Sequence, residues 1–334
     1  MSTSPNAIRF ASYIVAVQDL EKACAFYCAL GAELDRTTEL VQPTPISALL
    51  QELYDIPAGT KFRIAKLRIP GSDIVMRLAE FTDLDRGSSY PRFYDPGAVQ
   101  LILDLREIGP ALEAAREFGV KVITVGDAPV QIGFPGDPAP TEAIVVEDFD
   151  GHYVEFVRVN PEHVANKFGE TPGPAKLTQD LGVNIVFPSF RSVPKDLGDT
   201  VAFYREEFGL EIAASPWARD ESLMRMSGLT TDGESRVGEM RVPGTPPMHG
   251  WTFFETTAED ATPYELRLTD VGGYAIGLEV LDLPAAVSAI TKAGGSVITT
   301  GAGWVSTPAG DTMALVRDTN GLLLELVQYA GAEG

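Results

Sequence analysis

Histidine is the side chain best able to move protons or hold a metal near neutral pH, and this sequence contains three. His152 lies in a predicted turn beside Glu155, where we expect a surface or supporting role rather than metal ligation. His163 falls in a predicted linker and should be solvated. His249 follows two prolines and precedes a predicted strand at 251–255, so it could overhang a pocket as an acid, a base or a ligand.

Two cysteines, Cys24 and Cys28, are spaced C-x-x-x-C within a predicted helix. One such pair lacks the two further ligands of a closed zinc site, so we expect free thiols. The formal net charge of −21 argues against nucleic-acid and anionic-membrane partners, because no basic stripe is present to contact phosphates. No basic leader and no apolar run of about 18 residues occurs, which predicts a cytoplasmic protein.

The elements that must position such residues repeat four times along the 334 residues. The first copy has a strand at 10–17, a helix that begins at Asp19 and stops at Gly31, and strands at 62–69 and 74–81. The second has a strand at 99–105, a helix at 109–118 and further strands up to residue 159. The third begins with a strand at 183–187 and a helix at 201–208. An insertion at 191–199 lengthens the connection between them.

The fourth copy repeats the second closely. Asp148-Phe-Asp-Gly151 precedes Glu155, and Asp318-Thr-Asn-Gly321 precedes Glu325, with the same interval from the first aspartate to the glutamate. Two halves of two copies each are therefore predicted, as modules at 1–162 and 181–334 joined by a linker at 163–180.

These motifs resemble the vicinal oxygen chelate superfamily, which includes glyoxalase I, bleomycin-resistance proteins and extradiol dioxygenases. The opening resemblance lies in Val17-Gln-Asp-Leu20, Phe26-Tyr27 and Leu30-Gly31, and the closing one in the two Asp-x-Asp/Asn-Gly turns with their glutamates. It covers nearly the whole chain. It implies an α+β fold of four βαβββ units that form two glyoxalase-like modules, each with an open curved mixed β-sheet around a pocket.

The resemblance also implies where a site would lie, since family members that use metal hold it between the first and last strands of paired units. In the first module these positions fall on Ser12, Arg77, Gln100 and Glu155. In the second module they fall on Asn184 (or Val183), Thr252, Ala275 and Glu325, as the same alignment places them.

The metal itself is not expected. An arginine in the cavity repels a cation, and an Arg77–Glu155 pair could take the place of the ion. We therefore predict no cofactor. Divalent metal is the alternative, held by Gln100 and Glu155 in the first module or by Asn184 and Glu325 in the second.

We predict a glyoxalase-like enzyme of lyase or isomerase type that acts on a small organic molecule, aromatic or carbonyl-containing. Glu155 would be the acid or base, with Gln100, Ser12 or Arg77 contacting an oxyanion or carboxylate. Direct pairing with Arg77 would lower the pKa of Glu155 and make this role less suitable.

Three alternatives stay open at this point. The chain could be a non-catalytic binder that sequesters a small molecule, as bleomycin-resistance proteins do, or a dioxygenase-like enzyme with a divergent divalent-metal site. One module could also be active while the other stabilises the assembly. A small molecule is the expected partner, and the chain is expected to be a monomer or a homodimer.

Overall fold

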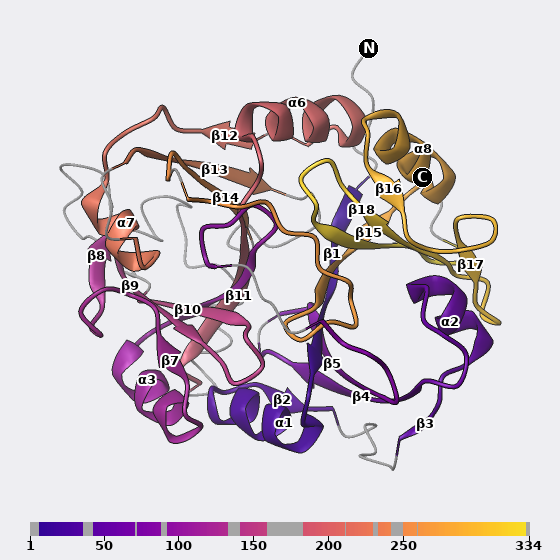
Figure 1. Cartoon of the computed structure of the whole chain (residues 1–334), viewed down its shortest axis with the longest axis horizontal. Coiled ribbons are helices and arrows are strands. Elements are labelled where there is room, and N and C mark those ends of the chain that lie inside the picture. Colours follow the sequence, from indigo (N-terminus) through magenta and orange to yellow (C-terminus); the bar gives the residue numbers. More distant parts are fainter. Residues whose placement is uncertain are drawn as a thin grey trace.

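The computed structural model describes residues 7–35, 43–70, 72–87, 92–132, 141–158, 183–210, 212–229, 233–241, 250–258 and 260–331. It confirms the predicted α+β class, with four units and two mixed sheets (Figure 1). Among these residues, no helix is long and apolar enough to cross a membrane.

Each unit begins with a strand and a helix and continues with shorter strands. The first unit comprises β1 (Ala7–Val17), α1 (Leu20–Ala29), β2 (Glu33–Leu34), β3 (Thr44–Pro45), α2 (Ala48–Tyr54), β4 (Lys61–Arg68) and β5 (Val75–Thr82). The second comprises β6 (Val99–Leu105), α3 (Ile108–Glu117), β7 (Lys121–Val122), β8 (Val130–Ile132), β9 (Thr141–Glu147) and β10 (Tyr153–Arg158).

The other two units follow the same order. The third comprises β11 (Ile185–Ser192), α6 (Leu197–Phe208), β12 (Ile212–Ala214), α7 (Glu221–Met226), β13 (Ser235–Arg241) and β14 (Gly250–Thr256). The fourth comprises β15 (Tyr274–Val280), α8 (Leu283–Lys292), β16 (Ser296–Val297), β17 (Val305–Ser306), β18 (Thr312–Arg317) and β19 (Leu323–Gln328).

The units do not pair within the halves of the chain, as the sequence prediction had them. One sheet, here called sheet A, runs β16-β18-β19-β15-β1-β5-β4-β2 and joins the first unit to the fourth through antiparallel β1 and β15. The other, sheet B, runs β12-β13-β14-β11-β6-β10-β9-β7 and joins the second unit to the third through β6 and β11. Each sheet therefore contains strands from both halves, and the predicted pairing of consecutive units is wrong.

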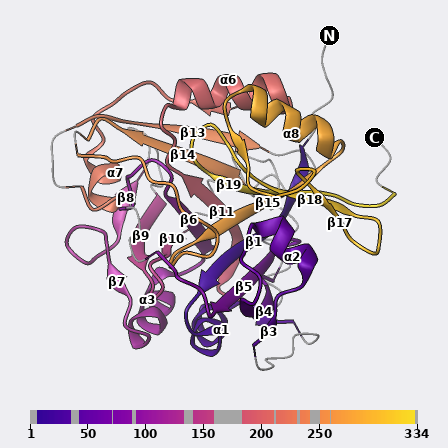
Figure 2. The ribbon, with the colours of Figure 1, turned by 45° about the vertical axis from the view of Figure 1, so that its right-hand side comes forward.

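The main core lies between the two sheets. Alternate residues of β1, such as Tyr13 and Val15, enter it together with Leu101 and Leu103 of β6. Phe190 of β11 packs against Tyr13 with ring centroids 5.0 Å apart, so aromatic contacts join sheet B directly to sheet A. Figure 1 shows α6 and α8 along one edge of this core and α1 and α3 along the opposite edge. The turned view in Figure 2 keeps these helix pairs at opposite ends.

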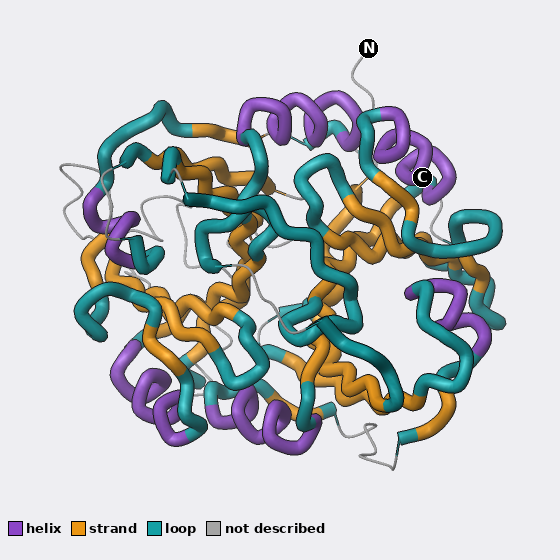
Figure 3. Tube along the Cα trace, in the orientation of Figure 1, coloured by secondary structure: helices purple, strands orange, loops and turns teal. Residues whose placement is uncertain are grey.

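The residues between these core positions face outward, away from the other sheet. A short helix covers each outer face: α2 lies over sheet A and α7 over sheet B, as the purple segments at the two sides of Figure 3 show. Leu50 and Tyr54 of α2 pack on Ile14, while Leu223 and Met226 of α7 pack on Ile102. Each outer face thus packs apolar side chains against its short helix.

The two Asp-x-Asp/Asn-Gly turns join neighbouring units. Asp148 accepts hydrogen bonds from the backbone N–H groups of Asp150 and His152, and its other oxygen accepts one from the Tyr27 hydroxyl at 3.2 Å. In the fourth unit, Asp318 accepts a bond from the Tyr204 hydroxyl at 3.0 Å in the same manner. The signature aspartates are therefore structural: each closes its own turn and binds a tyrosine of the adjacent unit.

Candidate active site

The strand pairing divides the predicted site residues between the two sheets. Ser12, Arg77 and Glu325 come together on the outer face of sheet A, whereas Gln100 and Glu155 lie on the outer face of sheet B. A single cluster of the first four predicted residues does not form, because β1 and β6 belong to different sheets. The predicted Arg77–Glu155 pair is wrong for the same reason.

In sheet A, Arg77 forms an ion pair with Glu325, which is fully buried. The same guanidinium donates to the Ser12 hydroxyl at 2.6 Å, and the Tyr54 hydroxyl donates to the second oxygen of Glu325 at 2.7 Å. Burial, and then the negative charge of Glu325, raise the pKa of Tyr54 well above its usual range. We call these four residues, Ser12, Arg77, Glu325 and Tyr54, the Ile14 cluster, after Ile14 of β1, which lies beside Arg77 in the strand register.

Gly277 shows how tightly the Ile14 cluster is packed. It lies opposite Ser12 across the β1–β15 pair, and a Cβ at this position would stand 2.1 Å from the Ser12 hydroxyl oxygen. Both oxygens of Glu325 already accept hydrogen bonds from protein groups. The carboxylate of this cluster is therefore fully used by protein groups, although Nε of Arg77 is buried without a hydrogen-bond partner.

In sheet B, the strand register arranges polar residues around Ile102. Ile102 of β6 has Glu155 of β10 beside it on one side and Ser189 of β11 on the other. Gln100 lies two residues before Ile102 on β6, opposite Arg191, and Asp104 lies two residues after it. All five polar side chains are buried. We call this set the Ile102 cluster: Ile102, Gln100, Asp104, Glu155, Ser189 and Arg191.

The Ile102 cluster leaves four buried polar atoms without hydrogen-bond partners, whereas the Ile14 cluster leaves one, Nε of Arg77. The four atoms of the Ile102 cluster are Oε1 of Gln100, both carboxylate oxygens of Glu155 and Nε of Arg191. Arg191 lies 2.7 Å from Glu155 as an ion pair, but the contact lacks the orientation of a hydrogen bond. Unsatisfied polar groups in a protein interior are costly, so their concentration on one face indicates a place prepared for a ligand or water.

Burial dominates the electrostatics of this cluster. It raises the pKa of Glu155, and the opposing effect of Arg191 does not reverse that shift. Arg191 lowers the pKa of Glu155, as expected of a paired arginine, but the desolvation of the fully buried carboxyl outweighs this effect. Burial also raises the pKa of Asp104, and the charge of Glu155 adds to it.

The residues present do not fit the divalent ion that the fold implies. In sheet B the oxygen donors at the implied positions are Gln100 and Glu155, and the guanidinium of Arg191 lies on the carboxylate that would bind the ion. In sheet A, Glu325 is taken up by Arg77 and Tyr54. Within the described residues, no three His, Cys, Asp or Glu side chains gather as a metal site would require.

Several predicted positions lie elsewhere. Asn184 exchanges two hydrogen bonds with the backbone of Glu107 near the end of β6, at 3.0 and 2.9 Å, so it belongs to neither cluster. His152 is buried rather than on the surface, with Nε2 3.1 Å from the carbonyl oxygen of Ala16. Burial lowers its pKa. His249 and His163 lie outside the described residues.

The sequence prediction missed Arg191, Asp104 and Tyr54. Arg191 was assigned to an insertion at 191–199, but β11 extends to Ser192 despite the internal proline. The alternation of Ser189 and Arg191 with apolar residues was the available signal. Tyr54 lies in α2, a helix of seven residues that was not predicted from the sequence.

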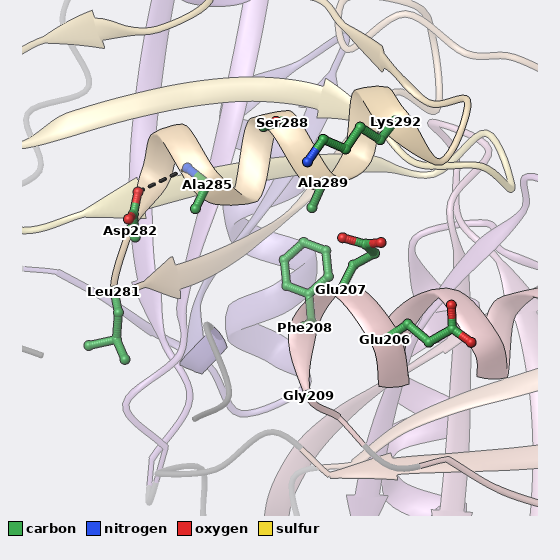
Figure 4. Close-up of a pocket in the computed structure, with 10 residues that line it drawn as sticks. All are labelled: Glu206, Glu207, Phe208, Gly209, Leu281, Asp282, Ala285, Ser288, Ala289 and Lys292. Atoms are coloured by element: carbon green, nitrogen blue, oxygen red, sulfur yellow. Dashed lines mark hydrogen bonds between the residues drawn. The ribbon is translucent and has the colours of Figure 1, made fainter. Parts of the chain in front are cut away.

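A separate surface groove of about 590 Å³ lies between the end of α6 and one side of α8 (Figure 4). Glu206, Glu207 and Phe208 line one side, and Ala285 and Lys292 line the other. It lies on the helix pair and contains none of the cluster residues, so the Ile102 cluster remains the candidate active site.

Four βαβββ units, two mixed sheets and a polar cluster on each outer face define a tandem protein of the vicinal oxygen chelate type. The family model of the Glyoxalase/Bleomycin resistance protein/Dioxygenase superfamily matches residues 9–156 and 187–326. The chain therefore belongs to this superfamily, with two matching regions.

Solved structures support the fold. Glyoxalase I from Zea mays is 14% identical, with a TM-score of 0.58 over 96% of this chain and 92% of that one. A putative dioxygenase from Bacillus subtilis, also 14% identical, has a TM-score of 0.52 over 97% of this chain and 86% of that one. No curated protein sequence matches. At these identities the similarity concerns the fold alone.

Proposed function

We propose that this protein is a glyoxalase-like enzyme of lyase or isomerase type that acts on a small carbonyl-containing molecule at the Ile102 cluster. The observation that carries the proposal is the group of buried polar atoms without hydrogen-bond partners on Gln100, Glu155 and Arg191, the last two of which form an ion pair. A ligand that satisfied these atoms would recover the cost of leaving them unpaired.

Glu155 is the proton acceptor in this proposal. The raised pKa of Glu155 lies closer to neutral pH than that of an ordinary carboxyl group. Such a carboxylate is suited to removing a proton from the carbon next to a carbonyl. The negative charge then develops on the carbonyl oxygen, where the unpartnered Nε of Arg191 can donate a hydrogen bond. Gln100 orients the substrate through its free amide oxygen.

The Ile14 cluster takes no part in the chemistry under this proposal. Its glutamate has both oxygens occupied, and its arginine and serine bind each other. One sheet would therefore be active while the other stabilises the assembly. Ser12 and Arg77, which the resemblance placed in a reactive cluster, act as structural residues.

Deuterium exchange tests the proposal without knowledge of the natural substrate. The protein is incubated in D₂O with hydroxyacetone or phenylacetone, and proton NMR follows the loss of hydrogen next to the carbonyl. We expect the wild type to accelerate exchange of one of these ketones and Glu155→Gln to reduce the rate by about 10²–10⁴-fold.

The matched control is Glu325→Gln, which makes the same change on the other sheet and should keep the wild-type exchange rate. Both variants are assayed at a temperature where circular dichroism shows them folded. Equal rates for the wild type and Glu155→Gln, or no acceleration by the wild type, would contradict the proposal.

A second candidate is a binding protein without catalysis. The apolar residues beside the cluster favour it, since Phe93, Tyr153 and Met226 form a wall against which a flat ligand can pack. Tight binding of a ligand that is recovered chemically unchanged would select this candidate over the enzyme.

A further inference from the structure

Asp104 is a second buried carboxyl group in the Ile102 cluster, and the proton transfer described above does not use it. It lies on β6 beyond Ile102, on the same face as Gln100, and is 8% exposed. Its Oδ2 accepts a long hydrogen bond of 3.4 Å from the Ser189 hydroxyl. A bond of this length does little to stabilise a buried negative charge.

The charges around Asp104 favour the neutral form of its carboxyl group. Glu155 on β10 and Arg191 on β11 both act on it, and Arg191 is already paired with Glu155 at 2.7 Å. One guanidinium balances one carboxylate, and a second buried negative charge would be uncompensated. In agreement, burial and then Glu155 hold the pKa of Asp104 well above its usual range.

A neutral carboxyl group gives the site a hydrogen-bond donor that an ionised one lacks. The cluster then offers donors on Asp104 and Arg191 and acceptors on Gln100 and Glu155, beside the apolar wall of Phe93. With Asp104 neutral and the ion pair balanced, the cluster carries no net charge. A carboxylate ligand would enter as an unbalanced buried charge, whereas a neutral carbonyl compound would not.

We propose that the Ile102 cluster binds neutral carbonyl compounds in preference to carboxylates, and that Asp104 donates a hydrogen bond to the carbonyl oxygen of the ligand. This inference rests on the proposed function only for the position of the site. It adds the class of ligand and a specificity-determining residue.

Two probes of the same shape but different charge test the ligand class. Benzamide is neutral and benzoate is an anion, and ligand-observed NMR titrations measure the affinity of each for the full chain. We expect the wild type to bind benzamide and to show no measurable benzoate binding. Tighter binding of benzoate than of benzamide, or no benzamide binding, overturns the proposal.

Two variants of Asp104 test the donor. Asp104→Asn keeps an N–H donor and no charge, so benzamide should bind within about threefold of the wild type. Asp104→Leu keeps the approximate volume and loses the donor, so affinity should fall about tenfold, the value of one hydrogen bond in such a site. Wild-type affinity in Asp104→Leu overturns the role of Asp104.

The variant Gln100→Leu distinguishes failure of the donor role of Asp104 from failure of the proposed site. If Gln100→Leu weakens benzamide binding and Asp104→Leu does not, the site stands and the donor role falls. If neither variant changes the affinity, both the site and the donor role fall. Tyr54→Phe, which changes only the Ile14 cluster, should bind benzamide as the wild type does.

Discussion

An arginine faces a buried glutamate on each sheet, but the two pairs differ in how many of their polar atoms have hydrogen-bond partners. Glu325 accepts hydrogen bonds from Arg77 and Tyr54, whereas neither oxygen of Glu155 has such a partner. In sheet A the carboxylate is satisfied and only Nε of the arginine is not, whereas in sheet B the carboxylate and Nε of the arginine both lack hydrogen-bond partners. This contrast distinguishes a structural cluster from a candidate active site at the residue scale.

Removing one member of the Arg77–Glu325 pair should strongly destabilise the folded protein. Glu325→Gln leaves Arg77, whose side chain is 16% exposed, without its charge partner. We expect the free energy of unfolding to fall by about 3–5 kcal/mol, measured by urea denaturation. The double variant Arg77→Met/Glu325→Leu should be clearly more stable than Glu325→Gln, and equal stability of the two would contradict this explanation.

Asp148 should make stability depend on pH. Burial raises its pKa to about 6 in the folded protein, against an ordinary value of 3.8. Because the folded pKa is the higher one, the stabilising contribution is complete below pH 3.8 and is lost as pH rises through about 6. Asp148→Asn removes this titration.

The measurement is the difference in unfolding free energy between the wild type and Asp148→Asn across pH 4 to 7. The wild type should lose up to about 3 kcal/mol relative to the variant over this interval. A difference that does not change with pH would show that Asp148 is not titrating in the folded state.

At the scale of elements, the helices α1, α3, α6 and α8 flank the core and each begins after an acidic N-cap residue. In all of them except α3 the side chain of this residue caps the helix. Asp19, Asp196 and Asp282 each cap a helix by accepting a backbone N–H bond in the first turn. Glu107 occupies this position in α3, with a similarly extended backbone, but makes no capping bond with its side chain. The longer side chain of glutamate suits this geometry poorly.

Glu107→Asp should therefore stabilise the protein by about 0.5–1 kcal/mol, as measured by thermal or urea unfolding. Its matched control is Asp19→Glu, which should destabilise by a similar amount because it removes the bond of 2.9 Å to the Lys22 N–H. Opposite signs in the two variants are the result that supports the capping argument.

The elements also show what the sequence could predict. Counting back from the helices gave Ser12 and Gln100 as site positions, and matching residues 75–78 to 153–156 aligned Arg77 with Glu155. In the structure Arg77 lies beside Ile14 of β1, and Glu155 lies in the same way beside Ile102 of β6. Which units share a sheet depends on contacts between residues far apart in the chain, such as Ser12 with Gly277. The four units have nearly the same order of elements, and no local sequence pattern determines which two of them share a sheet. The partners of Arg77 and Glu155 were therefore predicted wrongly.

At the scale of the whole molecule, each half of the chain supplies one unit to each sheet. Neither half then contains a complete sheet, and the antiparallel edges of β1 and β6 would be exposed in an isolated N-terminal half. Residues 1–162 and 181–334, produced separately, should fail to fold as monomers and should form a 1:1 complex when mixed. Analytical ultracentrifugation measures this, and two stably folded monomeric halves would contradict it.

The arginines of the two clusters come from positions that do not correspond. Arg77 lies on the last strand of its unit, in the place that Glu155 occupies in the second unit, whereas Arg191 lies on the first strand of the third unit. The two ion pairs therefore differ in the strands that they join. In sheet A the pair links the last strands of two units, β5 and β19, whereas in sheet B it links a first strand, β11, to a last strand, β10.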